Sequence, residues 1–232
     1  MEFRDRPVVV TGGTGALGTA VVSALVQAGA KATVPYFLPA EAERFPLRDD
    51  ARISLVGPID LSREADVARL YDGVPSLWAS IHLAGGFAAA GIVETDRAAL
   101  MGQIELNLVT AFLCCRAAVR TMRGSGGGRI VNVAARPALE GRAGAGMVAY
   151  ALSKSAVATL TMALAEEVVK DGILVNAVAP SIMDTPANRK AMPKADHASW
   201  PKVEEVAAAI LSLASPDNRI TRGAVLPVYG RV

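Results

Sequence analysis

Cysteine is scarce in this chain of 232 residues. The two cysteines, Cys114 and Cys115, are neighbours in a helical stretch, where adjacent side chains point in different directions. This excludes a disulfide scaffold and favours two buried free thiols, as expected in a reducing cytoplasm. His, Cys and carboxylate residues form no cluster with the spacing of metal ligands, so we expect no metal site.

An excess of charge of one sign is also missing. The formal net charge is +2 and no basic run with interleaved aromatic residues occurs, so we expect no nucleic acid as a partner. Residues 1–7 carry charges of both signs and lead directly into an apolar run, unlike a signal peptide. No uninterrupted apolar stretch has the length to span a bilayer, so we expect no membrane association. A cytoplasmic protein is the expectation that remains.

Apolar residues are plentiful, at 52% of the chain against 20% charged residues, which is enough for a sizeable core. No linker composition divides residues 1–232, so we expect a single domain. Short β-branched runs alternate with helical patterns, which predicts an α/β fold: a doubly wound parallel sheet of Rossmann type, about seven strands with helices on both faces. The expected strands are 7–11, 31–36, 52–56, 77–83, 129–134, 173–179 and 224–228, and the expected helices are 16–28, 64–71, 96–123, 147–170 and 203–214.

A glycine-rich turn follows the first expected strand. It carries Gly13, Gly15 and Gly18 in a G-x-G-x-x-G spacing and opens a helical pattern. Glycine permits the tight turn and lets backbone amides approach a pyrophosphate, whose charge the helix N-terminus favours. Between a strand and a helix, this spacing predicts a dinucleotide-binding site.

The end of the second strand ordinarily selects between the two nicotinamide dinucleotides. An acidic residue there binds the ribose of NAD, whereas a nearby arginine accommodates the phosphate of NADP. Here Tyr36 holds the position and Phe37 follows it, and neither is charged. Arg44 lies further along, at an expected surface position. The predicted cofactor is therefore NAD or NADP, with the preference left open.

Tyr150 and Lys154 stand four residues apart in an expected helix, so their side chains share one face. A free phenol has a pKa of about 10 and is a poor acid–base group at neutral pH. We expect the lysine ammonium, one turn away, to lower that pKa, so that the phenol exchanges a proton with a substrate. The pair gains its meaning from the dinucleotide-binding turn earlier in the chain.

Together these features resemble the short-chain dehydrogenase/reductase family over nearly the whole chain. The glycine turn, Asp60-Leu61, Ala84-Gly85, Asn107, Tyr150, Lys154 and residues 180–185 occur in the family's order. The resemblance implies an NAD(P)-dependent oxidoreductase with a small-molecule substrate and with Tyr150, Lys154 and Asn107 as catalytic residues, Asn107 by holding a water that links the lysine to solvent. The cofactor-binding residues that we expect are Gly12, Gly13, Gly15, Leu17, Gly18, Tyr36, Asp60, Leu61, Ala84, Gly85, Gly86, Tyr150, Lys154, Pro180, Ile182 and Thr185.

Departures from the family pattern narrow the interpretation. Ala135 stands where a serine ordinarily assists the tyrosine. Alanine cannot donate a hydrogen bond, and loss of one such donor costs ~10²–10³-fold in rate where an oxyanion develops. The chain resembles the dihydropteridine-reductase branch, which lacks this serine and reduces a conjugated ring. His82, where the family has asparagine, ends a buried strand and is expected to be a core histidine.

Residues 180–200 form the longest stretch without a regular pattern and contain three prolines. A long loop in a compact domain is usually functional, and we expect a substrate lid at about 181–200. The segment also resembles the dihydropteridine-reductase branch. Met192 and Trp200 are expected either to line the pocket or to anchor the loop.

Three functions remain open from the sequence. The leading hypothesis is hydride transfer to or from a small, cyclic and conjugated, dihydropteridine-like substrate. A carbonyl or alcohol oxidoreductase, such as a 3-oxoacyl-reductase-like enzyme, is the alternative within the same class. A nucleotide-binding protein without turnover is the alternative of another class. The absent serine favours the last of these, whereas the retained Tyr150, Lys154 and Asn107 argue against it.

Two long helical stretches, around 106–118 and 156–168, present apolar and small residues on more than one face. A single sheet cannot bury all of that surface. In the family the equivalent helices pair across a two-fold axis, so the resemblance implies a homodimer or homotetramer.

Overall fold

The computed structural model describes residues 1–232 as a seven-stranded parallel sheet with strand order β3-β2-β1-β4-β5-β6-β7. The alternation of strands and helices along the chain therefore gives the doubly wound fold that the sequence predicts. The strands are β1 (Pro7–Thr11), β2 (Lys31–Pro35), β3 (Ile53–Val56), β4 (Ala79–His82), β5 (Gly128–Val133), β6 (Ile173–Pro180) and β7 (Val225–Val228).

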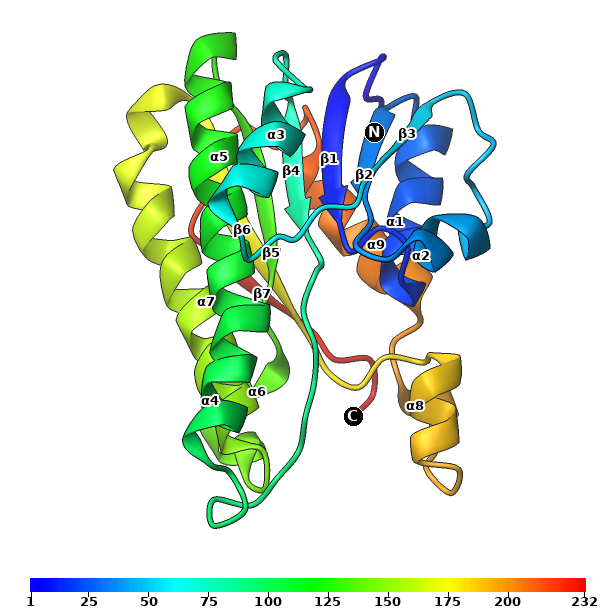
Figure 1. Cartoon of the computed structure of the whole chain (residues 1–232), viewed down its shortest axis with the longest axis vertical. Helices are drawn as coiled ribbons and strands as arrows, with labels where there is room; N and C mark the ends of the chain where they lie inside the picture. The colour runs from blue at the N-terminus through cyan, green and yellow to red at the C-terminus, as the bar shows by residue number, and fades with distance from the viewer.

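Helices cover both faces of the sheet (Figure 1). One face carries α1 and α9, which pack on each other, and the other carries α3, α5 and α7. Strand β1 shows why both layers form, since Val8 and Val10 join the core under α1 and α9 while Val9 joins the opposite core. The α-helices are α1 (Ala16–Gln27), α2 (Pro39–Arg44), α3 (Glu64–Asp72), α4 (Arg97–Ile104), α5 (Thr110–Ser125), α6 (Arg136–Leu139), α7 (Val148–Glu167), α8 (Pro186–Ala191) and α9 (Val203–Ala214).

All seven expected strands and all five expected helices are present, with ends within three residues of the predicted ones. Two predictions of secondary structure need correction. The expected helix 96–123 is interrupted by a π-helical turn, Glu105–Val109, between α4 and α5. The segment 180–200 is not irregular, because it contains α8 and a short 3₁₀ turn at His197–Ser199. Thr185 caps α8 and Pro186 occupies its first turn, which is a common pattern at the start of a helix. In the sequence, the prolines of this segment indicate only irregular structure.

The prediction that no stretch could span a bilayer was also too strict. The helical segments 97–125 and 148–167 are long and apolar enough to do so by length and composition alone. Both pack against the sheet, α5 on β4 and β5 and α7 on β5 and β6. Only 33% of the apolar window in 97–125 and 39% of that in 148–167 is buried, so packing against the sheet accounts for part of their apolar composition.

The strand order reverses between β1 and β4, which are neighbours at the centre of the sheet. Ligands of doubly wound folds bind at such a switch point, outside the carboxyl ends of the strands. The glycine turn after β1, the loop after β4 and the segment after β6 all start from that edge. In Figure 1 this is the lower edge, where α8 and the C-terminus also lie.

Candidate active site

The glycine turn after β1 is closely packed at three of its glycines and open at the fourth. A Cβ added at Gly12, whose φ is +67°, would lie 2.7 Å from the Ala84 amide nitrogen. A Cβ at Gly13 would lie 2.7 Å from a β2 side-chain carbon, and one at Gly18 would collide with the Gly12 carbonyl. Packing within the chain therefore accounts for these three glycines. Gly15 is exposed, and a Cβ there would meet nothing closer than 3.4 Å. Because glycine has no side chain, this position leaves room for a ligand.

Helix α1 points its N-terminus at this space. No side chain caps the helix and its first turn has no acidic residue, so its first amides remain free for a phosphate. Leu17, in the first turn, is buried and fixes the helix on the core. The predicted residues Gly12, Gly13, Gly15, Leu17 and Gly18 thus lie together in the turn and first helical residues between β1 and α1.

The loops after β3 and β4 start from the same edge of the sheet as this turn. Asp60 accepts hydrogen bonds on Oδ1 from the Ser62 amide (3.0 Å) and hydroxyl (2.7 Å), while its Oδ2 has no partner in the chain. The neighbouring Leu61 is half-buried. Ala84 donates its amide to Thr11 Oγ1 at 3.4 Å, which ties the loop after β4 to the glycine turn. The structure therefore brings these predicted residues to one edge of the sheet, with one carboxylate oxygen available.

Beyond the end of β2, Arg44 is exposed, as the sequence predicts. The Tyr36 hydroxyl donates to the Gly57 carbonyl at 3.3 Å, so the ring lies on the neighbouring strand end. Arg44 donates from Nε to the Ala40 carbonyl of its own helix at 2.9 Å. The Phe37 and Leu38 amides donate to one oxygen of Glu41, at 2.8 and 3.1 Å. A carboxylate thus stands where the sequence alone indicated no charged residue.

Tyr150 and Lys154 lie on one face of α7, as their spacing predicts. Lys154 is buried, and Nζ donates to the Val133 carbonyl at the end of β5 at 2.9 Å. Burial lowers the pKa of the lysine to about 8. The Tyr150 hydroxyl makes no hydrogen bond within the chain, and burial raises its pKa to about 12. The expected lowering of the phenol pKa by the ammonium is therefore wrong for the unliganded chain, where desolvation raises that pKa.

Asn107 lies in the π-helical turn and is buried. Its Oδ1 accepts from the Gly86 amide at 3.0 Å, and its Nδ2 donates to the Gly86 carbonyl at 3.0 Å and to Ser153 Oγ at 3.2 Å. A Cβ at Gly85 would lie 2.6 Å from Asn107 Oδ1 and 3.4 Å from Lys154 Nζ. A bare Gly85 therefore lets the asparagine and the lysine approach each other. We call Asn107, Tyr150, Ser153 and Lys154 the outer polar cluster.

Phe87 and Ala135 bear on the chemistry predicted for Tyr150. Phe87 packs its ring edge-to-face on Tyr150, with centroids 4.9 Å apart, and is 62% exposed. Ala135 follows β5 as the N-cap of α6 and is 5% exposed, so its place is filled by a methyl group and not by a hydroxyl. The Tyr150 ring therefore has an aromatic neighbour, and position 135 offers no hydroxyl group.

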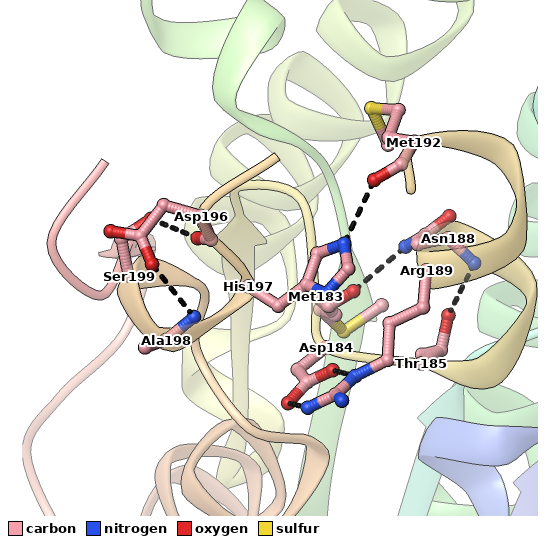
Figure 2. Close-up of polar contacts among 10 residues, drawn as sticks. All are labelled: Met183, Asp184, Thr185, Asn188, Arg189, Met192, Asp196, His197, Ala198 and Ser199. Carbon is pink, nitrogen blue, oxygen red and sulfur yellow. Dashed lines mark hydrogen bonds and ion pairs between the residues drawn. The ribbon is translucent and has the colours of Figure 1, made fainter. Parts of the chain in front are cut away.

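The segment after β6 is held together by its own polar contacts (Figure 2). Asp184 accepts two hydrogen bonds from Arg189, at 2.5 and 2.7 Å, and His197 Nε2 lies 2.8 Å from the Met192 carbonyl. The Asp184 amide donates to the Pro201 carbonyl at 2.9 Å, which closes the base of the segment. Trp200 is 6% exposed and therefore anchors the segment.

The three cofactor contacts predicted after β6 lie at the start of this segment. Pro180 ends β6 and is buried, whereas Ile182 is exposed. The Thr185 hydroxyl accepts from the Asn188 amide at 3.2 Å and so caps α8, which leaves its proton free to donate. Figure 2 shows Thr185 beside Asn188 at the start of α8.

A second group of polar side chains lies wholly inside the protein, between the sheet and α3, α5 and α7. We call Tyr71, Ser80, His82, Asn132 and Thr161 the inner polar cluster. The Tyr71 hydroxyl lies 2.7 Å from Ser80 Oγ, which lies 2.7 Å from His82 Nε2. His82 Nδ1 lies 2.8 Å from Asn132 Oδ1, and Asn132 Nδ2 donates to Thr161 Oγ1 at 2.9 Å.

The inner polar cluster has one consistent direction of donation. Thr161 donates its proton to the Val157 carbonyl at 2.8 Å, so it accepts from Asn132. Asn132 Oδ1 then accepts from a protonated His82 Nδ1, which leaves Nε2 to accept from Ser80. Burial lowers the pKa of His82 to about 4, which keeps the ring neutral. The prediction of a satisfied core histidine is confirmed.

Sequence reasoning missed several groups that the structure places at the site. Ser153 joins Asn107 to α7 and is only a serine between Tyr150 and Lys154 in the sequence. The Val133 carbonyl that receives Lys154 is backbone and carries no side-chain signal. Glu41 falls three residues after the N-cap of α2, but that N-cap is Leu38, so the sequence lacks the Ser or Thr that marks a capping box.

Comparison with known proteins agrees with this geometry. The sequence profile described as short chain dehydrogenase matches residues 6–196. The chain belongs to the short-chain dehydrogenase family. It is 34% identical to cis-4-hydroxycyclohexanecarboxylate dehydrogenase of Sinomonas cyclohexanicum, over 98% of this chain and 96% of the relative. It is 32% identical to 3alpha-hydroxysteroid dehydrogenase of Mediterraneibacter gnavus, over 99% and 98%.

Solved structures give the same fold. ElxO with NADP bound superposes with a TM-score of 0.90 at 24% identity, covering 97% of this chain and 98% of that chain. A short-chain type dehydrogenase/reductase from Mycobacterium ulcerans also gives 0.90, at 26% identity, covering 99% and 90%. The protein is therefore an oxidoreductase of the short-chain dehydrogenase family with NAD or NADP as its cofactor.

Proposed function

We propose that this enzyme transfers hydride between NAD(P) and a small, cyclic and conjugated substrate, of the kind that dihydropteridine reductases use. The observation that carries the proposal is the methyl group of Ala135 at the place where a serine hydroxyl ordinarily helps the tyrosine. A reaction that restores conjugation in a ring develops no isolated alkoxide, so it does not require that hydroxyl. The exposed Phe87 ring beside Tyr150 suits a flat substrate.

The residues of the outer polar cluster divide the work. The bound nicotinamide supplies or accepts the hydride. Tyr150 is protonated in the unliganded chain. Its hydroxyl has no partner within the chain, and we assign it the donation of a proton to the reduced substrate. Lys154 has two ammonium protons beyond the one given to Val133, and these serve the nicotinamide ribose and a water held near Asn107.

Carbonyl or alcohol oxidoreduction is the second candidate. The relatives favour it, since cis-4-hydroxycyclohexanecarboxylate and 3α-hydroxysteroids are ring alcohols by name. In that case Tyr150 alone has to stabilise the oxyanion, and the enzyme works without a donor worth ~10²–10³-fold in rate. Both candidate reactions use the same proton donor. They differ in how much the reaction rate falls because Ala135 replaces a serine.

Restoring the serine separates the two candidates. Ala135→Ser should raise kcat/KM for cyclic ketones at least ~10-fold, because a donor at a developing oxyanion is worth that much or more, and should leave reduction of a quinonoid dihydropterin nearly unchanged. Steady-state kinetics with both substrates measures this, with Ala138→Ser in α6 as the matched control. Efficient ketone reduction by the native chain, with no gain from the serine, would contradict the proposal.

The proposed assembly is a homodimer or homotetramer through the outer face of α5 and α7. An open groove of about 630 Å³ lies between α3, α5 and α7. Apolar side chains on these helices remain exposed, among them Phe112 at 49%, Leu152 at 55% and Met162 at 47%. A second copy related by a two-fold axis would cover this surface with the same surface.

The segment 181–200 is proposed as the substrate lid. Its base is closed by the hydrogen bond between Asp184 and Pro201, and Trp200 anchors one end. Between these points, α8 is stabilised by contacts within the segment (Figure 2). Such a unit can move as one body about its base.

A further inference from the structure

We infer that Glu41 makes this enzyme selective for NAD(H) over NADP(H), by binding the adenosine ribose hydroxyls and repelling a 2′-phosphate. The inference rests on the cofactor class of the enzyme and not on the identity of its substrate. The two dinucleotides differ only in the group on the ribose 2′-oxygen, which lies beside the end of the second strand in dinucleotide-binding folds. The selectivity must therefore come from the residues around that strand end.

The loop after β2 is already bonded to a carboxylate. Glu41 Oε2 accepts from the amides of Phe37 and Leu38, at 2.8 and 3.1 Å. These are the first two backbone amides beyond the strand end that do not bond to the neighbouring strand, and they are the donors that an incoming phosphate would use. An internal negative charge thus occupies the donors that a 2′-phosphate needs.

The same carboxylate has an unused acceptor. Glu41 Oε1 receives no hydrogen bond from the chain, because both amides donate to Oε2. A carboxylate oxygen accepts readily from hydroxyl groups. Tyr36, at the strand end itself, cannot take this role, since its hydroxyl is committed to the Gly57 carbonyl. Phe37 and Leu38 are each more than half exposed and give the adenosine an apolar wall.

No cation near the strand end is set to receive a phosphate. Arg44 donates from Nε to the Ala40 carbonyl on its own helix. Arg69 donates to the Pro58 carbonyl and pairs with Asp66 at 3.2 Å. Arg63 is exposed, with its side chain unpaired at the start of α3, beyond the Asp60 loop. A 2′-phosphate would meet the Glu41 carboxylate before it met any of these arginines.

Titration of the full-length protein with NADH and NADPH tests the inference without a known substrate. Binding is followed by nicotinamide fluorescence or calorimetry. We expect NADH to bind at least ~10-fold tighter than NADPH, because two like charges at about 4 Å near a protein surface cost that much or more. Competition with 5′-AMP and 2′,5′-ADP, which differ only in the 2′-phosphate, should show the same preference.

Two variants locate the preference in Glu41. Glu41→Gln keeps an oxygen that caps the two amides but removes the charge, and it should reduce the NADH/NADPH affinity ratio at least ~10-fold. Glu41→Ala frees both amides and should move the ratio further in the same direction. Glu43→Gln removes one charge from an exposed position of the same helix and should leave the ratio unchanged.

Three outcomes would overturn the inference. NADPH binding as tightly as NADH, or more tightly, would overturn it alone and leave the oxidoreductase assignment intact. An unchanged ratio in both Glu41 variants would remove Glu41 as the determinant. Failure of both dinucleotides to bind would overturn the inference together with the cofactor class.

Discussion

Two clusters of polar residues meet helix α7, and they differ in how completely their hydrogen-bonding groups are paired. The inner polar cluster reaches the helix at Thr161, and its donors and acceptors from Ser80 to the Val157 carbonyl are all matched. The outer polar cluster reaches it at Tyr150, Ser153 and Lys154. There the phenol has no partner and the ammonium has one, the Val133 carbonyl.

The difference separates structure from chemistry on a single helix. Matched polar groups in a core fix the register of the elements that carry them. Here Asn132 bonds two partners and directly precedes Val133, whose carbonyl receives Lys154. The unmatched hydrogen-bonding capacity of Tyr150 and Lys154 has no structural use within the chain, which is consistent with the roles that we propose for them. The inner cluster therefore holds β5 and α7 in the relation that the outer cluster needs.

The largest effect on stability is expected from breaking the inner cluster at its centre. Asn132→Ala should lower the free energy of unfolding by about 4 kcal/mol, because it opens a cavity and leaves the His82 and Thr161 groups without their partner. Chemical denaturation measures this, and Thr159→Ala, an exposed position on α7, serves as the control. A loss below about 1 kcal/mol would show that the cluster is not a structural unit.

Acid should weaken the same cluster through His82. The unfolded histidine takes up a proton below a pKa of about 6.5, whereas the folded one does so only near its pKa of about 4. Between these values the unfolded chain binds more protons, so the free energy of unfolding falls as the pH falls, by about 3 kcal/mol in total.

Carboxylates such as Asp66 and Asp184 have lowered pKa values, so their protonation on acidification also lowers the free energy of unfolding of the protein. The comparison is therefore made with His82→Asn by denaturation at several pH values from 7 to 4. The native chain should show the steeper decline between pH 6.5 and 4. Parallel declines in the two proteins would mean that the buried ring is not the source.

The sequence predicted the fold well, because its signals are local. Strand runs, helix periods and the glycine spacing report backbone requirements directly, as the contacts of Gly12 and Gly18 explain. Predictions failed where tertiary burial decides the outcome. The spacing of Tyr150 and Lys154 gave their common face correctly, but not that desolvation raises the phenol pKa to about 12.

The rest of the site depends on contacts between distant segments, which a single sequence does not reveal. The inner cluster joins residues from β4, β5, α3 and α7. The segment 181–200 contains a helix that starts at a threonine cap and a proline, and the neighbouring prolines made this start difficult to recognise in the sequence. Glu41 is a similar case, because its hydrogen bonds to the Phe37 and Leu38 amides appear only in the folded chain.

The variant Tyr150→Phe tests the central claim most directly, because it removes one hydroxyl that the folded chain does not use. Its free energy of unfolding should stay within about 0.5 kcal/mol of the native value, and NADH should still bind. Turnover of a verified substrate should fall by ~10²–10⁴-fold, the usual contribution of a general acid. Unchanged turnover, or a loss of stability comparable to that of Asn132→Ala, would contradict the account.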